Sequence, residues 1–184
     1  MKTIFVIILF AAITARGQPA QVILLRHGEK PAGAEEVHLS ARGRERAQAL
    51  VSLLGRHSQL TSNAPVAALY ATRVTRHDHG QRTGETLNPL AKDLDLPVRT
   101  PLGSDEYSRL AANVLGNSAY RGKTVIICWT HSELAQFASA LGVRPPPPAW
   151  KANTFDRLWR ITFSPGHTQL IDLPQHLLKG DSTR

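Results

Sequence analysis

Two short stretches of almost uninterrupted apolar residues recur in the pattern of hydrophobic and polar positions along the chain. Residues 21–26 read QVILLR and residues 124–130 read TVIICWT, and both are rich in Val and Ile. Strands that are buried on both faces of a largely parallel sheet typically have this composition. Residues 64–71, APVAALYA, form a weaker candidate for a further strand. The pattern therefore predicts a buried central sheet.

Helical periodicity occupies the segments between these candidate strands. Residues 40–57 begin at Ser40, a favourable capping residue, and their apolar side chains share one face. The arginines of this segment fall largely off that face: Arg42, Arg44 and Arg46. Three further segments also have helical patterns: residues 83–94, 104–116 and 131–141.

The end of the chain has a different pattern. Residues 157–163, RLWRITF, and residues 168–173, TQLIDL, are separated by the turn residues Ser164-Pro165-Gly166. This arrangement predicts a C-terminal hairpin. Together with the alternating strands and helices, it predicts an α/β fold: a three-layer sandwich with a mostly parallel central sheet and helices on both faces.

The first residues resemble a secretory signal peptide. Lys2 precedes an apolar run over residues 3–14, which is too short to span a bilayer comfortably, and small residues follow it. We expect residues 1–17 to be removed, although cleavage after Ala15 or Ala20 fits too. An uncleaved N-terminal anchor is the alternative. A single mature domain, residues 18–184, would then be secreted or periplasmic, without stable membrane association.

The chain is strongly basic, with 22 Lys and Arg against 14 Asp and Glu. The positive residues are scattered, and no nucleic-acid-binding module is recognisable, so we expect no nucleic-acid partner. A basic surface of this kind attracts anionic small molecules instead. Cys128 is the single cysteine, so no intramolecular disulfide can form.

Polar residues follow two of the candidate strands directly. Arg26-His27-Gly28 ends the first strand, and Thr130-His131-Ser132 ends the later one. In α/β folds ligands bind at the carboxyl ends of the strands, so both histidines are expected at one crevice. A buried charge is costly unless it is paired or poised for a ligand. Glu29 and Lys30 are expected to pair with each other or with solvent.

The same segments resemble the histidine phosphatase superfamily, also called the phosphoglycerate mutase-like proteins. The resemblance covers most of the chain after residue 17. It rests on motifs that occur in the family's order: RHG at 26–28, LSARGRERA at 39–47, Arg82 and Thr86 ahead of LPV at 96–98, and His131 after a late apolar strand. Residues 155–163, FDRLWRITF, are similar to the closing strand of exported bacterial members.

The resemblance implies a phosphomonoester phosphatase that needs no metal and no cofactor. His27 would attack phosphorus and form a phosphohistidine, which water then hydrolyses. Arg26, Arg82 and His131 would hold the phosphoryl oxygens. The family's general acid corresponds by position to Glu106, with Asp105 beside it. Both acids would also fit a purely structural role in the first turn of a helix.

The segment before Arg82 leaves two questions open. It is longer than in many relatives, which makes Arg76 a rival for the second phosphate-binding arginine or a contact for the rest of the substrate. His77-Asp78-His79 has zinc-ligand character, which would favour a metallohydrolase or a metal-binding module. The sequence contains no further ligand cluster to complete such a site, so solvated loop histidines fit better.

Alternatives to the phosphomonoesterase also stay open. Within the same family they are a phosphohistidine protein phosphatase or a mutase, and from another class a catalytically silent anion-binding protein. The expected partner is a small phosphorylated substrate whose identity the motifs do not specify, because the loops that contact the leaving group lie outside them. The oligomeric state is equally unspecified.

Overall fold

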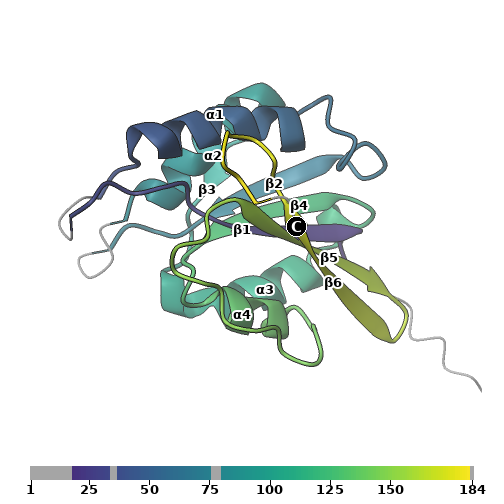
Figure 1. The fold of residues 1–184 in the computed structure, drawn as a ribbon. Coiled ribbons are helices and arrows are strands. Elements are labelled where there is room, and N and C mark those ends of the chain that lie inside the picture. Colours follow the sequence, from purple (N-terminus) through teal and green to yellow (C-terminus); the bar gives the residue numbers. More distant parts are fainter. Residues whose placement is uncertain (1–17, 34–36, 76–79, 183–184) are drawn as a thin grey trace, which may run out of the picture.

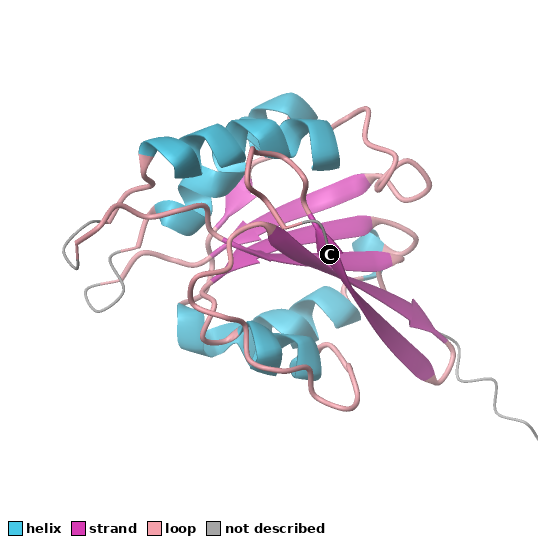
Figure 2. Ribbon diagram, viewed as in Figure 1, coloured by secondary structure: helices cyan, strands magenta, loops and turns pink. Residues whose placement is uncertain are grey.

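A six-stranded sheet separates two layers of helices (Figures 1 and 2). The computed structural model describes residues 18–33, 37–75 and 80–182. The proposed signal peptide and the candidates Arg76 and His77-Asp78-His79 lie outside these residues. The strands are β1 (Gln21–Arg26), β2 (Val66–Ala71), β3 (Val98–Arg99), β4 (Thr124–Trp129), β5 (Arg157–Ser164) and β6 (His167–Pro174).

The strand order is β3-β2-β4-β1-β5-β6. β3, β2, β4 and β1 run parallel, whereas β5 pairs antiparallel with β1 and forms a hairpin with β6. The predicted α/β sandwich and C-terminal hairpin are therefore confirmed. β3 is too short to have produced a pattern in the sequence.

Helices α1 (Ala41–Leu54) and α2 (Arg82–Leu94) pack on each other and cover one face of the sheet. On the other face lie α3 (Tyr107–Gly116) and α4 (Leu134–Ala140) (Figure 1). All four lie within the predicted helical segments except for the first residue of α2. The short helices η1 (Ser104–Glu106) and η2 (Ser118–Tyr120) flank α3. Within the described residues, no helix is long and apolar enough to cross a membrane.

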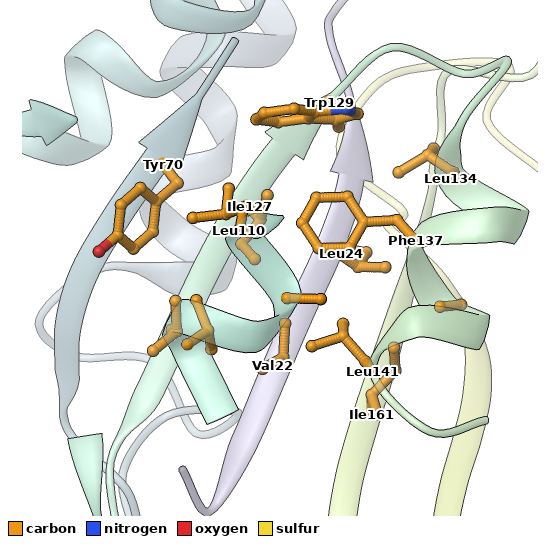
Figure 3. Close-up of a cluster of buried hydrophobic side chains, with 14 of the residues drawn as sticks. Val22, Leu24, Tyr70, Leu110, Ile127, Trp129, Leu134, Phe137, Leu141 and Ile161 are labelled. Atoms are coloured by element: carbon orange, nitrogen blue, oxygen red, sulfur yellow. The ribbon is translucent and has the colours of Figure 1, made fainter. Parts of the chain in front are cut away.

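The continuous apolar runs of the sequence follow from burial of the sheet on both faces. In β1, Val22 and Leu24 belong to the core under α3 and α4, whereas Ile23 and Leu25 belong to the core under α1 and α2. Figure 3 shows the first of these clusters, in which Trp129 of β4 lies above Phe137 of α4. Their rings meet edge to face, with centroids 5.3 Å apart.

The parallel pairing of β1 with β4 determines where the chain leaves the sheet. Arg26 is the register partner of Trp129, so His27 and Thr130 emerge side by side at the carboxyl ends of neighbouring strands. β2 lies on the other side of β4 and also ends at this edge. The segments that follow β1, β4 and β2 therefore meet at one edge of the sheet, at the carboxyl ends of the strands, where α/β folds bind their ligands.

Candidate active site

His27 is buried at this edge of the sheet, with 5 % of its surface exposed. Burial is the largest of the causes that lower the pKa of His27 to about 3; the hydrogen bond to the Gly28 carbonyl opposes the shift, and the nearby Arg26, Arg82 and His131 add to it. A neutral imidazole is therefore the form that the site favours. Arg26 ends β1 and His27 follows it, His131 follows the neighbouring strand β4, and Arg82 begins the helix whose Thr86 binds the Gly28 N–H.

The tautomer of His27 follows from the hydrogen bond that its ring makes with Gly28. Nδ1 lies 2.7 Å from the carbonyl oxygen of Gly28. Because a carbonyl can only accept, Nδ1 must carry the proton and donate it. The lone pair then resides on Nε2, so Nε2 is the ring nitrogen that is able to act as a nucleophile.

Arg26 is 2 % exposed and is oriented by the loop that precedes β5. Its Nη1 donates to the carbonyl oxygens of Ala152 and Thr154, the latter at 3.5 Å, and its guanidinium lies 3.9 Å from the ring centre of Phe155. Burial and the charge of Arg82 lower the pKa of Arg26 to about 10, so it stays positive at neutral pH. Its buried Nε has no hydrogen-bond partner among the described residues and can donate to an anion.

Arg82 opens α2 and is partly buried. Thr86, one turn further along, accepts a hydrogen bond from the Gly28 backbone N–H at 2.9 Å and donates to the Arg82 carbonyl oxygen at 2.7 Å. At the start of the helix, Thr83 shares a 2.7 Å hydrogen bond with Thr72, just after β2. These contacts hold the helix that carries Arg82 against the loop that carries His27.

The glycines of two motifs allow their backbones to approach closely. A Cβ on Gly28 would lie 2.8 Å from the carbonyl oxygen of Gly43, and one on Gly43 would lie 2.3 Å from the carbonyl oxygen of Glu29. Ser40 caps α1 by accepting from the Gly43 N–H at 3.1 Å, as its position predicts. The glycine of LSARGRERA therefore packs α1 directly against the residues that follow His27.

Two predictions about charged residues near this loop are wrong. Glu29 pairs with Arg46, at 2.7 Å, rather than with Lys30 or solvent alone. Arg46 was expected off the buried face of its helix, yet it is 2 % exposed. Its partner on the other side is Asp181, at 2.8 Å, which lies too far along the chain for a local pattern to indicate.

His131 follows β4 and is partly buried at the start of a turn that leads into α4. Burial and the charges of Arg26 and Lys30 lower its pKa, while Glu133 opposes the shift. The helix itself begins at Leu134, three residues later than predicted, because the chain makes a turn before entering it.

Glu106 ends η1, and the carbonyl oxygen of Ser104, at the start of the same short helix, accepts a 2.9 Å hydrogen bond from Trp129 Nε1. The Glu106 carboxylate accepts from the Gly103 N–H at 2.9 Å and from Arg109 at 3.2 Å and Arg73 at 3.3 Å. The Gly103 hydrogen bond, followed by these arginines, lowers the pKa of Glu106. The neighbouring Asp105 is exposed.

Phe155 was not singled out from the sequence as a site residue. Its ring lies against the Arg26 guanidinium and 6.1 Å, centre to centre, from the His27 ring. The segment FDRLWRITF contains it, but strand patterning alone assigns it no role. As for metal ligands, no group of three or more His, Cys, Asp or Glu side chains that could hold an ion occurs among the described residues.

Comparison with known proteins finds similarity in structure and not in sequence. No protein-family model and no curated protein sequence matches the chain. Among solved structures, a proposed alpha-ribazole-5'-P phosphatase from Escherichia coli matches with a TM-score of 0.57 and 16% identity, covering 85% of this chain and 97% of its own.

Two further solved structures share the fold. A phosphoserine phosphatase from Entamoeba histolytica, in complex with 3-phosphoglyceric acid, matches with a TM-score of 0.53 and 16% identity over 86% of this chain and 99% of its own. A mycobacterial glucosyl-3-phosphoglycerate phosphatase with inorganic phosphate matches with a TM-score of 0.51 and 16% identity over 83% and 95%. At these identities, the likeness establishes a common fold.

Proposed function

We propose that this chain is a phosphatase of the histidine phosphatase type that hydrolyses small phosphomonoesters through a phosphohistidine on His27. The observation that carries the proposal is the state of His27: neutral, with Nδ1 donating to Gly28 and with Arg26 and Arg82 nearby. A nucleophile next to cationic groups suits an anionic substrate. The fold shared with proteins named as phosphatases supports the same conclusion.

The reaction has two steps. In the first, the lone pair of His27 Nε2 attacks phosphorus, the bond from phosphorus to the ester oxygen breaks, and the leaving alcohol takes a proton from a general acid. In the second, a water oxygen attacks the phosphohistidine, the P–N bond breaks, and the water proton returns to the base form of that acid. Phosphate then leaves, and neutral His27 is restored.

The cationic residues around His27 would stabilise the charge that develops on phosphorus. The forked guanidiniums of Arg26 and Arg82 match the geometry of phosphoryl oxygens. His131 would add a further donor. Because Arg26 already has Nη1 committed to the loop before β5, its remaining donors are held in a fixed direction before substrate arrives.

Glu106 is our proposed general acid, with Asp105 as the alternative. Its position in η1 supports the assignment, since the Ser104 carbonyl is tied to the end of β4. The lowered pKa of Glu106 keeps it ionised at neutral pH in the free protein. The acid role therefore requires clearly acidic solution or a substrate that draws Arg73 and Arg109 away from Glu106.

The test is phosphate release from a panel of phosphorylated metabolites, combined with rapid quenching to trap an acid-labile, alkali-stable adduct. We expect turnover and a phosphohistidine in the wild type and neither in His27→Ala. His57→Ala is the matched control, because His57 is an exposed histidine outside the site. Turnover by His27→Ala at the wild-type rate would refute the proposal, and phosphate binding without turnover would favour a silent anion-binding protein.

We further propose that the protein acts outside the cytoplasm after removal of residues 1–17. The support is the positively charged start, the short apolar run and the small residues that follow it. Mass spectrometry of protein recovered from the secreted or periplasmic fraction should show an N-terminus at Gln18. Recovery of the intact chain from the cytoplasm would contradict this.

A further inference from the structure

Asp181 closes a buried ion-pair network that begins two residues after His27. The Arg46 guanidinium donates to both oxygens of Glu29, with Nη2–Oε1 at 2.7 Å and Nε–Oε2 at 3.0 Å. Its other edge donates to Asp181, with Nη2–Oδ1 at 2.8 Å and Nη1–Oδ2 at 3.0 Å. Nη1 also donates to Gln175 Oε1 at 3.1 Å. The network thus joins the loop that carries His27 and Glu29, here called the nucleophile loop, to residue 181 near the end of the chain.

The segment that carries Asp181, residues 175–182, is here called the C-terminal turn. Asp181 Oδ2 accepts from the backbone N–H groups of Leu177 and Leu178 at 2.9 and 3.0 Å, which closes the turn on itself. Arg42 of α1 donates to the Lys179 carbonyl oxygen at 2.9 Å. In Figure 1 the turn, in yellow, accordingly folds back from the end of β6 towards α1.

The C-terminal turn also contacts the segment on the other side of His27. The Ser182 N–H donates to the Asp156 carboxylate, and the Gln175 N–H donates to the Asp156 carbonyl oxygen at 2.8 Å. Asp156 directly follows Phe155, whose ring packs on the Arg26 guanidinium. The C-terminal turn therefore contacts both the network that holds Glu29, two residues after His27, and the segment whose Phe155 packs on Arg26.

Net stability alone does not account for this arrangement. The Arg46, Asp181 and Glu29 side chains are only 2, 3 and 15 % exposed. Removing such charges from water costs nearly as much free energy as their pairing returns, so a buried ion pair adds little net stability over apolar packing. What the forked guanidinium does supply is a fixed geometry between the two carboxylates.

From these contacts we propose that Asp181 is a positioning residue for the phosphatase reaction, an inference that rests on the function proposed above. Asp181 orients Arg46, Arg46 holds Glu29, and Glu29 follows Gly28, whose carbonyl oxygen accepts from His27 Nδ1 at 2.7 Å. Without Asp181, the Arg46 guanidinium loses the carboxylate that fixes its orientation, and Arg46 holds Glu29 less firmly. The His27 ring then spends less time aligned with the phosphorus, which slows formation of the P–N bond.

The experiment compares Asp181→Asn, Asp181→Glu and a matched control, Asp172→Asn. Asp172 pairs with Arg157 at 2.8 Å on the β5–β6 hairpin and is 48 % exposed, outside the network. Steady-state and single-turnover rates are measured with p-nitrophenyl phosphate, and inhibition is measured with inorganic phosphate. Urea unfolding of each variant identifies conditions in which all are fully folded.

Under those conditions, kcat and the single-turnover rate of Asp181→Asn should fall about ten- to a hundred-fold, the size expected when a reacting group is slightly misplaced. KM and the phosphate inhibition constant should change little, since Arg26 and Arg82 remain. Asp181→Glu should recover part of the rate because it restores the carboxylate. Asp172→Asn should match the wild type.

Wild-type kcat in folded Asp181→Asn, or a rate loss that only follows its unfolded fraction, would overturn the positioning role while leaving the proposed function intact. A wild-type chain that neither releases phosphate nor forms a phosphohistidine would overturn the proposed function, and this inference with it. The two failures are therefore distinguishable.

Discussion

Thr86 and Gly28 form the direct link between the helix that carries Arg82 and the loop that carries His27. Thr86 is fully buried, and its hydroxyl accepts from the Gly28 N–H at 2.9 Å while donating to the Arg82 carbonyl oxygen. One side chain thus satisfies a buried backbone donor and sets the spacing between the proposed nucleophile and a proposed phosphate ligand.

Replacing Thr86 by Val should therefore be costly although the two side chains have nearly the same shape. Val leaves the buried Gly28 N–H unpaired, which costs about 1–3 kcal/mol in the free energy of unfolding. Thr86→Ser keeps the hydroxyl and should lose less. Urea denaturation of both variants measures the difference. A Thr86→Val protein as stable as the wild type would show that the hydrogen bond contributes nothing.

Replacing Arg82 and Arg76 by Ala, one at a time, distinguishes which of the two arginines binds the phosphate. A charge-assisted hydrogen bond is worth about 1.5–3 kcal/mol, so Arg82→Ala should lower kcat/KM roughly ten- to a hundred-fold or more. Arg76 lies outside the described residues, and we expect Arg76→Ala to have a much smaller effect. The comparison requires only steady-state rates on one substrate. The reverse order of effects would transfer the phosphate-binding role to Arg76.

Much of the fold was predictable because the sheet is buried on both faces. In β1 and β4 every residue is buried, so each strand reads as an apolar run whichever way its side chains point. β3 has only two residues, and its position depends on pairing with β2 rather than on its own composition. No local pattern could have indicated it.

The site was predictable only where its residues belong to short motifs. Arg26, His27, Arg82 and His131 were predicted in this way, and the structure places them at the carboxyl ends of β1 and β4 and at the start of α2. Other contributors act over long separations in the chain. The helical pattern alone predicts that Arg46 faces solvent, whereas its burial depends on the ion pair with Asp181, far along the chain. Phe155 acquires a role only because its loop returns across Arg26.

The low pKa of His27 has a consequence for stability. In the unfolded chain a histidine binds a proton near its ordinary pKa of 6.5, whereas folded His27 does so only near 3. The unfolded state therefore binds more protons over this window. The contribution of neutral His27 is complete above pH 6.5 and is lost as the pH falls towards 3, by at most about 1.4 kcal/mol per pH unit.

We expect His27→Gln to remove this part of the acid sensitivity, since Gln is neutral and can still donate to the Gly28 carbonyl. The free energy of unfolding, measured in urea at pH 7 and pH 5, should fall less in the variant than in the wild type. His131, whose pKa is lowered in the same direction, is present in both proteins and cancels from the comparison. Identical pH dependence in the two would show that His27 titrates normally.

The pH dependence of catalysis should reflect Glu106 on its alkaline side. His27 is neutral above pH of about 3, so the nucleophile is available throughout mildly acidic solution. A general acid must be protonated, and the Gly103 N–H, Arg109 and Arg73 lower the pKa of Glu106. These two conditions place the maximum of kcat/KM below pH 7 for esters with poor leaving groups.

Glu106→Gln should lower kcat/KM for an alkyl phosphate by about a hundred-fold or more, the usual size of a general-acid contribution. The loss should be small for p-nitrophenyl phosphate, whose leaving group needs no proton, and Asp105→Asn should be nearly silent on both substrates. Arg109→Gln offers an independent check. It removes a charge 3.2 Å from Glu106, so the pKa of the carboxyl rises and the alkaline limb moves to higher pH. Equal losses on both esters, with an unmoved limb in Arg109→Gln, would mean that Glu106 only caps its helix and that another group protonates the leaving alcohol.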